Sequence, residues 1–89
     1  MAGACTLLAT QAALAFLLCQ PPVTAAEMAR AGEVACRAIQ RDGACNAWFW
    51  DDPRYAARKA PMSDSQAALA IATWVNKTGA LQIHRPPRP

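Results

Sequence analysis

The chain has 89 residues, with 9 Lys and Arg against 6 Asp and Glu, so its formal net charge at pH 7 is +3. A charge this small, without a dense basic stripe, gives no support to nucleic-acid binding. The charged part, residues 27–89, is too short for a large core, and domains of this size usually need a disulfide, a metal or a partner. The sequence has one His and no short paired spacing of Cys or His, so we expect no metal ion and no cofactor.

The first 26 residues carry no charged side chain, which separates them from the rest of the chain. Residues 1–22 are therefore either a retained apolar helix, most simply a membrane-spanning one, or a signal-like segment. The apolar part of this segment, residues 2–19, would be about 27 Å long as a helix, near the lower limit for crossing a bilayer. The signal would be cleaved at the small residues near Ala25 or Ala26. We favour the retained helix, in which Cys5 and Cys19 are small apolar side chains.

A second helix is predicted for residues 25–41. Thr24 and Glu27 match a capping box, in which each side chain bonds to the backbone of the other residue. Glu33 and Arg37 have the spacing of a favourable i,i+4 pair. Apolar residues recur at intervals of three and four and give the helix one apolar stripe, formed by Met28, Ala31, Ala35, Ala38 and Ile39.

Cys36 and Cys45 flank Asp42-Gly43, where the chain is expected to reverse. We predict a disulfide between Cys36 and Cys45, which would stabilise a small domain by about 2.5–3 kcal/mol in the chain-entropy model. Two buried free thiols are the alternative. A disulfide favours an oxidising compartment for this part of the chain.

Trp48-Phe49-Trp50 is the strongest recognition feature. Along an extended segment alternate residues point to the same side, so Trp48 and Trp50 would face one way and Phe49 would face the apolar stripe of the helix. Trp and Tyr are enriched at protein interfaces. We therefore predict that a partner binds four aromatic residues, Trp48, Trp50, Tyr55 and Trp74. The alternative is that they form the core.

Two more helices are predicted after the aromatic segment. A short one begins at Asp52-Pro53 and ends before Pro61. The next begins at the capping box of residues 63–66 and continues through the apolar run 67–75, which a buried or interfacial helix would explain. Gly79 is the expected cap, and residues 85–89 form an extended or polyproline II tail. His84, beside this tail, is interpreted as a solvated side chain.

The predicted fold is therefore all-α. An N-terminal apolar helix over residues 1–22 precedes a small helical domain over residues 23–84, and a Pro/Arg tail follows over residues 85–89. No arrangement of side chains indicates catalysis. Asp51 and Asp52 could be paired carboxylates, but a turn and a helix cap explain them more simply.

Residues 36–50 carry a resemblance. Cys36 followed by Cys45-Asn46-Ala47-Trp48-Phe49-Trp50 resembles the Cys-rich end, with its Phe and Trp, of the small lumenal photosystem I subunit N. The Cys spacing differs by one residue, and that family ends at the motif where this chain continues. The resemblance implies a small subunit of an organelle complex.

These observations predict a non-catalytic accessory subunit that is anchored in a large membrane protein complex of the respiratory or photosynthetic type. Its partners would be neighbouring subunits and the lipid bilayer, with no nucleic acid and no small-molecule substrate. Its place would be the mitochondrial inner or thylakoid membrane, with the remaining part in an oxidising compartment. The alternative is a secreted or periplasmic mini-protein, held by the Cys36–Cys45 disulfide, that binds a partner through a Trp-Phe-Trp patch.

Overall fold

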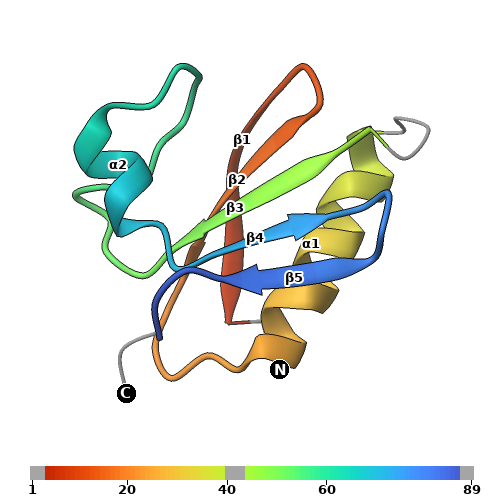
Figure 1. Ribbon diagram of the computed structural model, residues 1–89, viewed down its shortest axis with the longest axis horizontal. Coiled ribbons are helices and arrows are strands. Elements are labelled where there is room, and N and C mark those ends of the chain that lie inside the picture. The colour runs from red at the N-terminus through yellow and green to blue at the C-terminus, as the bar shows by residue number, and fades with distance from the viewer. Residues whose placement is uncertain (1–3, 40–43, 87–89) are drawn as a thin grey trace.

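The computed structural model describes residues 4–39 and 44–86. These residues form one mixed sheet, in the strand order β1-β2-β3-β4-β5, and two helices (Figure 1). The strands are β1 Cys5–Gln11, β2 Leu14–Cys19, β3 Asn46–Trp50, β4 Ala72–Val75 and β5 Ala80–Ile83. The helices are α1 Ala25–Ile39 and α2 Asp64–Leu69.

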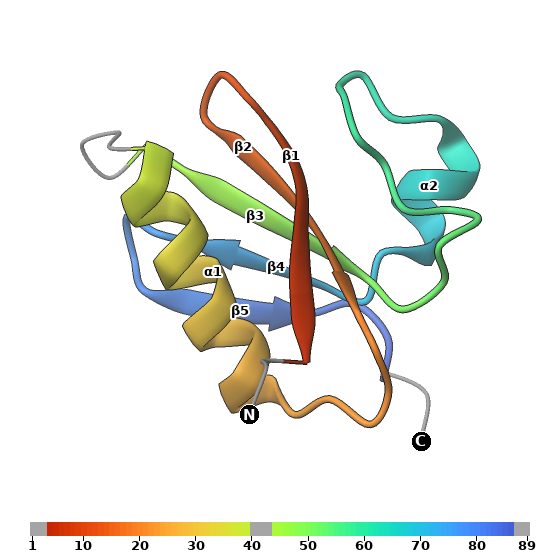
Figure 2. The ribbon, with the colours of Figure 1, turned by 180° about the vertical axis from the view of Figure 1, so that it is seen from behind.

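The order of the strands in the sheet follows the order of the chain. β1 and β2 form an antiparallel hairpin, and β3, β4 and β5 form an antiparallel meander. β2 and β3 are parallel, so the chain between them needs a crossover, which α1 supplies. The helix lies across one face of the sheet, in front of it in Figure 2. The segment between β3 and β4, which includes α2, packs on the opposite face.

The expectation of an all-α fold is wrong, and so is the expectation of a membrane-spanning helix over residues 1–22. This uncharged segment contains β1 and β2. Side chains on both faces of β2 pack into the cores, so the strand is a continuous apolar run that periodicity cannot distinguish from a helix. The turn after β1 contains no Gly, and Ala12 adopts its positive φ of 52°. Among the described residues, no helix combines the length and the apolarity needed to cross a membrane.

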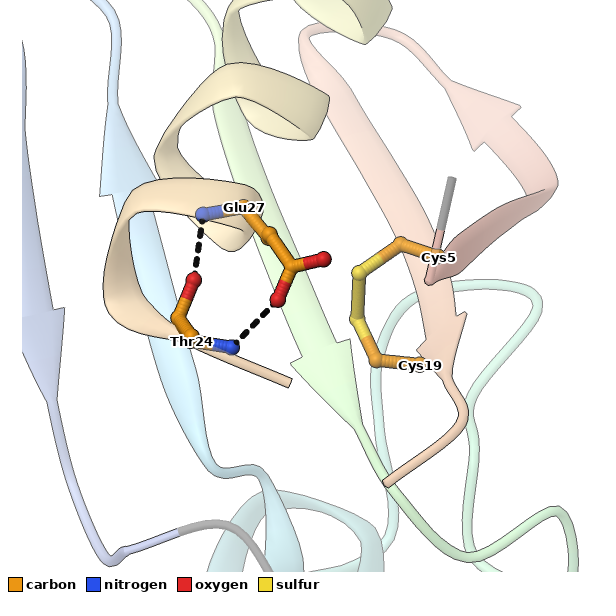
Figure 3. The surroundings of a disulfide bond; sticks show 4 residues. All are labelled: Cys5, Cys19, Thr24 and Glu27. Carbon is orange, nitrogen blue, oxygen red and sulfur yellow. Dashed lines mark hydrogen bonds between the residues drawn. A yellow bond between two sulfur atoms is a disulfide. The ribbon is translucent and has the colours of Figure 1, made fainter. Parts of the chain in front are cut away.

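The prediction of α1 and its cap is confirmed. The hydroxyl of Thr24 accepts a 3.1 Å hydrogen bond from the Glu27 amide, and the Glu27 carboxylate accepts a 2.8 Å bond from the Thr24 amide (Figure 3). Glu33 and Arg37 form the predicted pair at 3.5 Å. The predicted helix stop at residues 42–43 lies outside the described residues.

The other two predicted helices are corrected. Residues 52–60 form turns and bends, in which the Asp52 carboxylate accepts the Arg54 amide at 3.0 Å without starting a helix. The capping box of Ser63 and Gln66 is present, but α2 ends at Leu69 and β4 follows. Apart from Thr73, β4 is apolar, because it lies between β3 and β5 and is buried over most of its length. Gly79, with a φ of 69°, lies between β4 and β5 and caps no helix.

Two apolar clusters lie on the two faces of the sheet. The α1-side cluster joins Met28, Ala35 and Cys36 of the helix to strand residues that include Leu17 and Phe49. The α2-side cluster is smaller and has a core of Phe16, Trp50, Ala57 and Ala70. Because β2 and β3 supply side chains to both clusters, the hairpin and the rest of the sheet fold around shared cores.

Candidate functional site

All four cysteines are in disulfides. The predicted Cys36–Cys45 bond is present and connects the last turns of α1 to the residue before β3. The Cys5–Cys19 bond was not predicted, because both residues were assigned to a helix. In the hairpin they are direct cross-strand partners, with Cα atoms 3.9 Å apart. The signal for this bond in the sequence is the pair of cysteines itself. A hairpin over residues 5–19 places the two cysteines opposite each other.

The structure separates the four aromatic residues that were predicted to bind a partner. β3 alternates as expected: Phe49 packs in the α1-side cluster, while Trp48 and Trp50 face the α2 side with Tyr55. Trp74 lies on the α1 side instead. Trp50 is 0 % exposed, and its indole N–H donates a 2.7 Å hydrogen bond to the backbone carbonyl of Gln66. Trp50 therefore serves the core of the isolated chain.

Trp48 remains half-buried at the edge of the α2-side cluster. Its ring stacks on the exposed His84 imidazole, with centroids 6.0 Å apart, and a His84 ring nitrogen lies 2.6 Å from the Thr73 hydroxyl. His84 is thus more than a solvated side chain, since it is held by these two contacts. Partner binding by the four aromatic residues, of which Trp48 and Tyr55 are half-buried, stays a prediction.

The carboxylates of Asp51 and Asp52 belong to separate ion pairs. Asp51 is buried and accepts a 2.6 Å bond from the Arg85 guanidinium. Asp52 accepts two side-chain bonds from Arg54, and these hydrogen bonds and the opposite charge raise the pKa of the Arg54 guanidinium. Each carboxylate thus holds another segment of the chain in place, although Asp52 caps no helix, contrary to the expectation from the sequence. No group of three potential metal ligands occurs within residues 4–39 and 44–86.

An apolar groove of about 510 Å³ lies between α1 and the β1–β2 hairpin. The sequence did not indicate it, because the hairpin was not predicted. Its walls are mainly Ala, Leu and Val side chains, contributed by Ala4, Cys5, Leu7, Leu17, Ala26, Ala31, Val34, Ala35 and Ala38. Leu7 is 43 % exposed and Val34 is 54 % exposed, and these are two of the three large apolar side chains that are exposed among the described residues. The third, Ile83, lies on β5 at the other edge of the sheet.

Two charged side chains border the groove, Glu27 and Arg30. Glu27 is held by its two capping hydrogen bonds with Thr24 and lies beside the Cys5–Cys19 disulfide (Figure 3). Arg30, one turn further along α1, is exposed and forms no ion pair with the described residues. The groove is therefore apolar along its walls and has one cation that is available to a ligand.

Comparison of the chain with protein-family models, with curated proteins and with solved structures finds no match. The resemblance of residues 36–50 to the photosystem I subunit accordingly stays an expectation from the sequence. Any function has to be inferred from the geometry of the chain itself.

Proposed function

We propose that this chain is a secreted or periplasmic binding module that holds an apolar partner in the groove between α1 and the β1–β2 hairpin. Two disulfides in so short a chain fit an oxidising compartment. The observation that carries the proposal is the exposure of Leu7 and Val34 on the walls of one groove. Apolar side chains gathered in a concave site are typical of a binding surface.

The walls of the groove are held in place before any partner arrives. The Cys5–Cys19 disulfide joins β1 to β2, and the Thr24–Glu27 capping box fixes the start of α1 next to it. A site that is ordered in the free protein loses less conformational entropy on binding. These restraints therefore favour a groove that receives a ligand over one that closes on itself.

The proposal requires the uncharged N-terminal segment to remain in the functional protein. Ala15, Phe16 and Leu17 of β2 are at most 2 % exposed and contribute to both cores. Cleavage near Ala25 or Ala26 would remove both strands of the hairpin and one wall of the groove. A membrane anchor is not part of the proposal, because the segment that was expected to form it pairs with β3 through β2.

NMR mapping with the apolar dye anilinonaphthalene sulfonate tests the groove. We expect the dye to shift the amide signals of Leu7 and Val34 and to leave those near Trp48 unchanged. The Val34→Asp variant should lose most of this binding, because it places a charge on the apolar wall. The matched control is Ile83→Asp, which changes another exposed apolar residue at the other edge of the sheet and should bind normally. Shifts that centre on Trp48 and Tyr55 would instead assign the binding surface to the α2 side.

A further inference from the structure

β1 is an edge strand that borders the groove. Within the described residues it pairs with β2 alone, so its other side carries no strand. Natural edge strands usually carry charges, Pro or bulges that prevent further pairing. β1 has the sequence CTLLATQ, without a charge or a Pro. Its register shifts between Leu7 and Ala9, which leaves the Cys5–Leu7 stretch regular and open.

The backbone groups that face outward can be assigned from the hairpin. Gln20 donates a 2.8 Å hydrogen bond to the Ala4 carbonyl, so the polar groups of Ala4 face β2. In an antiparallel pair the residues alternate between facing the partner strand and facing away from it. The N–H and C=O groups of Cys5 and Leu7 therefore face away from β2, and those of Thr6 face towards it.

Cys5 and Leu7 combine two properties. Their backbone groups are open at the edge of the sheet, and their side chains line the groove. A strand placed beside them would pair with these groups and direct every second side chain towards α1. An apolar chain such as a lipid tail would fill the groove but would leave the backbone donors and acceptors without partners. The edge therefore favours a peptide over a lipid.

We propose that an extended peptide of a partner protein adds to β1 as a further strand and inserts alternate apolar side chains into the groove. This inference rests on the proposed function and specifies its ligand. Strand addition of this kind takes affinity from backbone hydrogen bonds and specificity from pockets for alternate side chains. The peptide carries an acidic group, either a side chain or its terminal carboxylate, that pairs with Arg30 at the border of the groove.

The charge at the border favours such a peptide over a second copy of this chain. A second β1 could pair edge to edge and bring its Leu7 to the groove. However, the β1 sequence has no acidic residue to meet Arg30. A partner peptide with an acid beside its apolar positions satisfies the backbone groups, the apolar walls and the guanidinium together.

Selection from a library of displayed random peptides tests the proposal with the full, oxidised chain as the target. We expect the selected peptides to alternate apolar and polar residues and to contain an acid at a fixed position. A synthetic copy of the best peptide should bind at least about fivefold more weakly when the backbone N–H groups that face β1 are methylated. The amides of Cys5 and Leu7 should exchange more slowly in the complex. Arg30→Gln should weaken binding about two- to fivefold, and Arg37→Gln, the matched change outside the groove, should leave it unchanged.

Four outcomes would overturn the inference. Peptides with apolar residues at helical spacing would show that the groove receives a helix. Equal binding of the methylated peptide would show that the β1 carbonyls accept no hydrogen bonds from a peptide strand. The absence of any selected peptide, together with dye binding in the groove, would refute strand addition while the proposed function stands. A concentration-dependent dimer that Leu7→Asp abolishes would assign the edge to a second copy.

Discussion

The two faces of the sheet are closed by different kinds of chemistry. On the α1 side, a continuous helix packs apolar residues on the strands, and the buried Trp74 lies against Gly32. The Trp74 indole N–H is buried without an acceptor among the described residues, so packing alone fixes this ring. On the α2 side, an irregular segment is fixed by polar contacts, since Trp50 donates to Gln66 and Arg85 pairs with Asp51.

This difference between the two faces of the sheet explains why the groove lies on the α1 side. A straight helix covers the middle of a twisted sheet and leaves space at an edge strand, which in Figure 2 lies beside the helix rather than beneath it. An irregular segment can follow the surface of the sheet and fill it. The α2 side, which is held by polar contacts, therefore covers its apolar cluster more completely. The α1 side, which is held by apolar packing, retains the exposed side chains of Leu7 and Val34.

The largest effect expected is the loss of both disulfides, which join elements on the α1 side. In the chain-entropy model the Cys5–Cys19 bond contributes about 3 kcal/mol and the Cys36–Cys45 bond about 2.5–3 kcal/mol. Together these approach the whole stability of many small domains. Replacement of all four cysteines by Ser should therefore unfold the chain at room temperature, as circular dichroism would show. A cooperative melt of this variant with an unchanged spectrum would show that the two cores suffice alone.

The next largest effect tests the α2 side. Trp50→Ala should cost about 3–5 kcal/mol, because it removes a fully buried ring and leaves the Gln66 carbonyl without its donor. Trp48→Ala, the matched change two residues earlier on the same face, should cost about 1–2 kcal/mol because the Trp48 ring is only partly buried. Urea denaturation of both variants gives the difference. Equal costs would mean that Trp48 is as important to this core as Trp50.

The sequence predicted those parts of the fold that depend on neighbouring residues. The capping boxes at Thr24 and Ser63 are local hydrogen-bonding patterns, and both are present. The stripe of α1 and the alternation of β3 also follow from spacing alone. The Cys36–Cys45 bond could be predicted for the same reason, since its two cysteines are only 9 positions apart in the chain.

The sequence did not predict the parts that depend on distant residues. β2 and β4 appear helical in sequence because β2 packs in both cores and β4 lies between β3 and β5, and their own residues do not record those neighbours. The segment after β3 depends on Arg85, which lies 34 residues from Asp51. The candidate groove was missed with the hairpin, because it exists only where β1 meets α1. The turn residues did not indicate the hairpin either, because Ala12 occupies a positive-φ position at which Gly or Asn is usual.

A smaller effect tests the packing of α1 on β4. An alanine usually stabilises a helix by about 1 kcal/mol relative to glycine. At Gly32 the added Cβ would lie 2.6 Å from Cγ and 2.7 Å from Cβ of Trp74. These atoms are next to the backbone and cannot rotate away, so Gly32→Ala should destabilise the chain by about 1–3 kcal/mol. Thermal denaturation measures the change, and a stabilised variant would mean that α1 is free to move off the sheet.

The smallest effect on stability belongs to the groove itself and separates binding from folding. Val34 is 54 % exposed, and Val and Asp have similar helix propensities, so Val34→Asp should change the free energy of unfolding by no more than about 0.5 kcal/mol. Its carboxylate would lie one helical turn from Arg30 and partly neutralise the cation that the proposed peptide needs. Ala35→Asp, at the next position, buries a charge where the side chain is 4 % exposed and should cost several kcal/mol. Urea denaturation and peptide titration of both variants give the comparison. A Val34→Asp variant that is stable but no longer binds the selected peptide would show that this exposed wall serves recognition, whereas one that unfolds would show that Val34 belongs to the core.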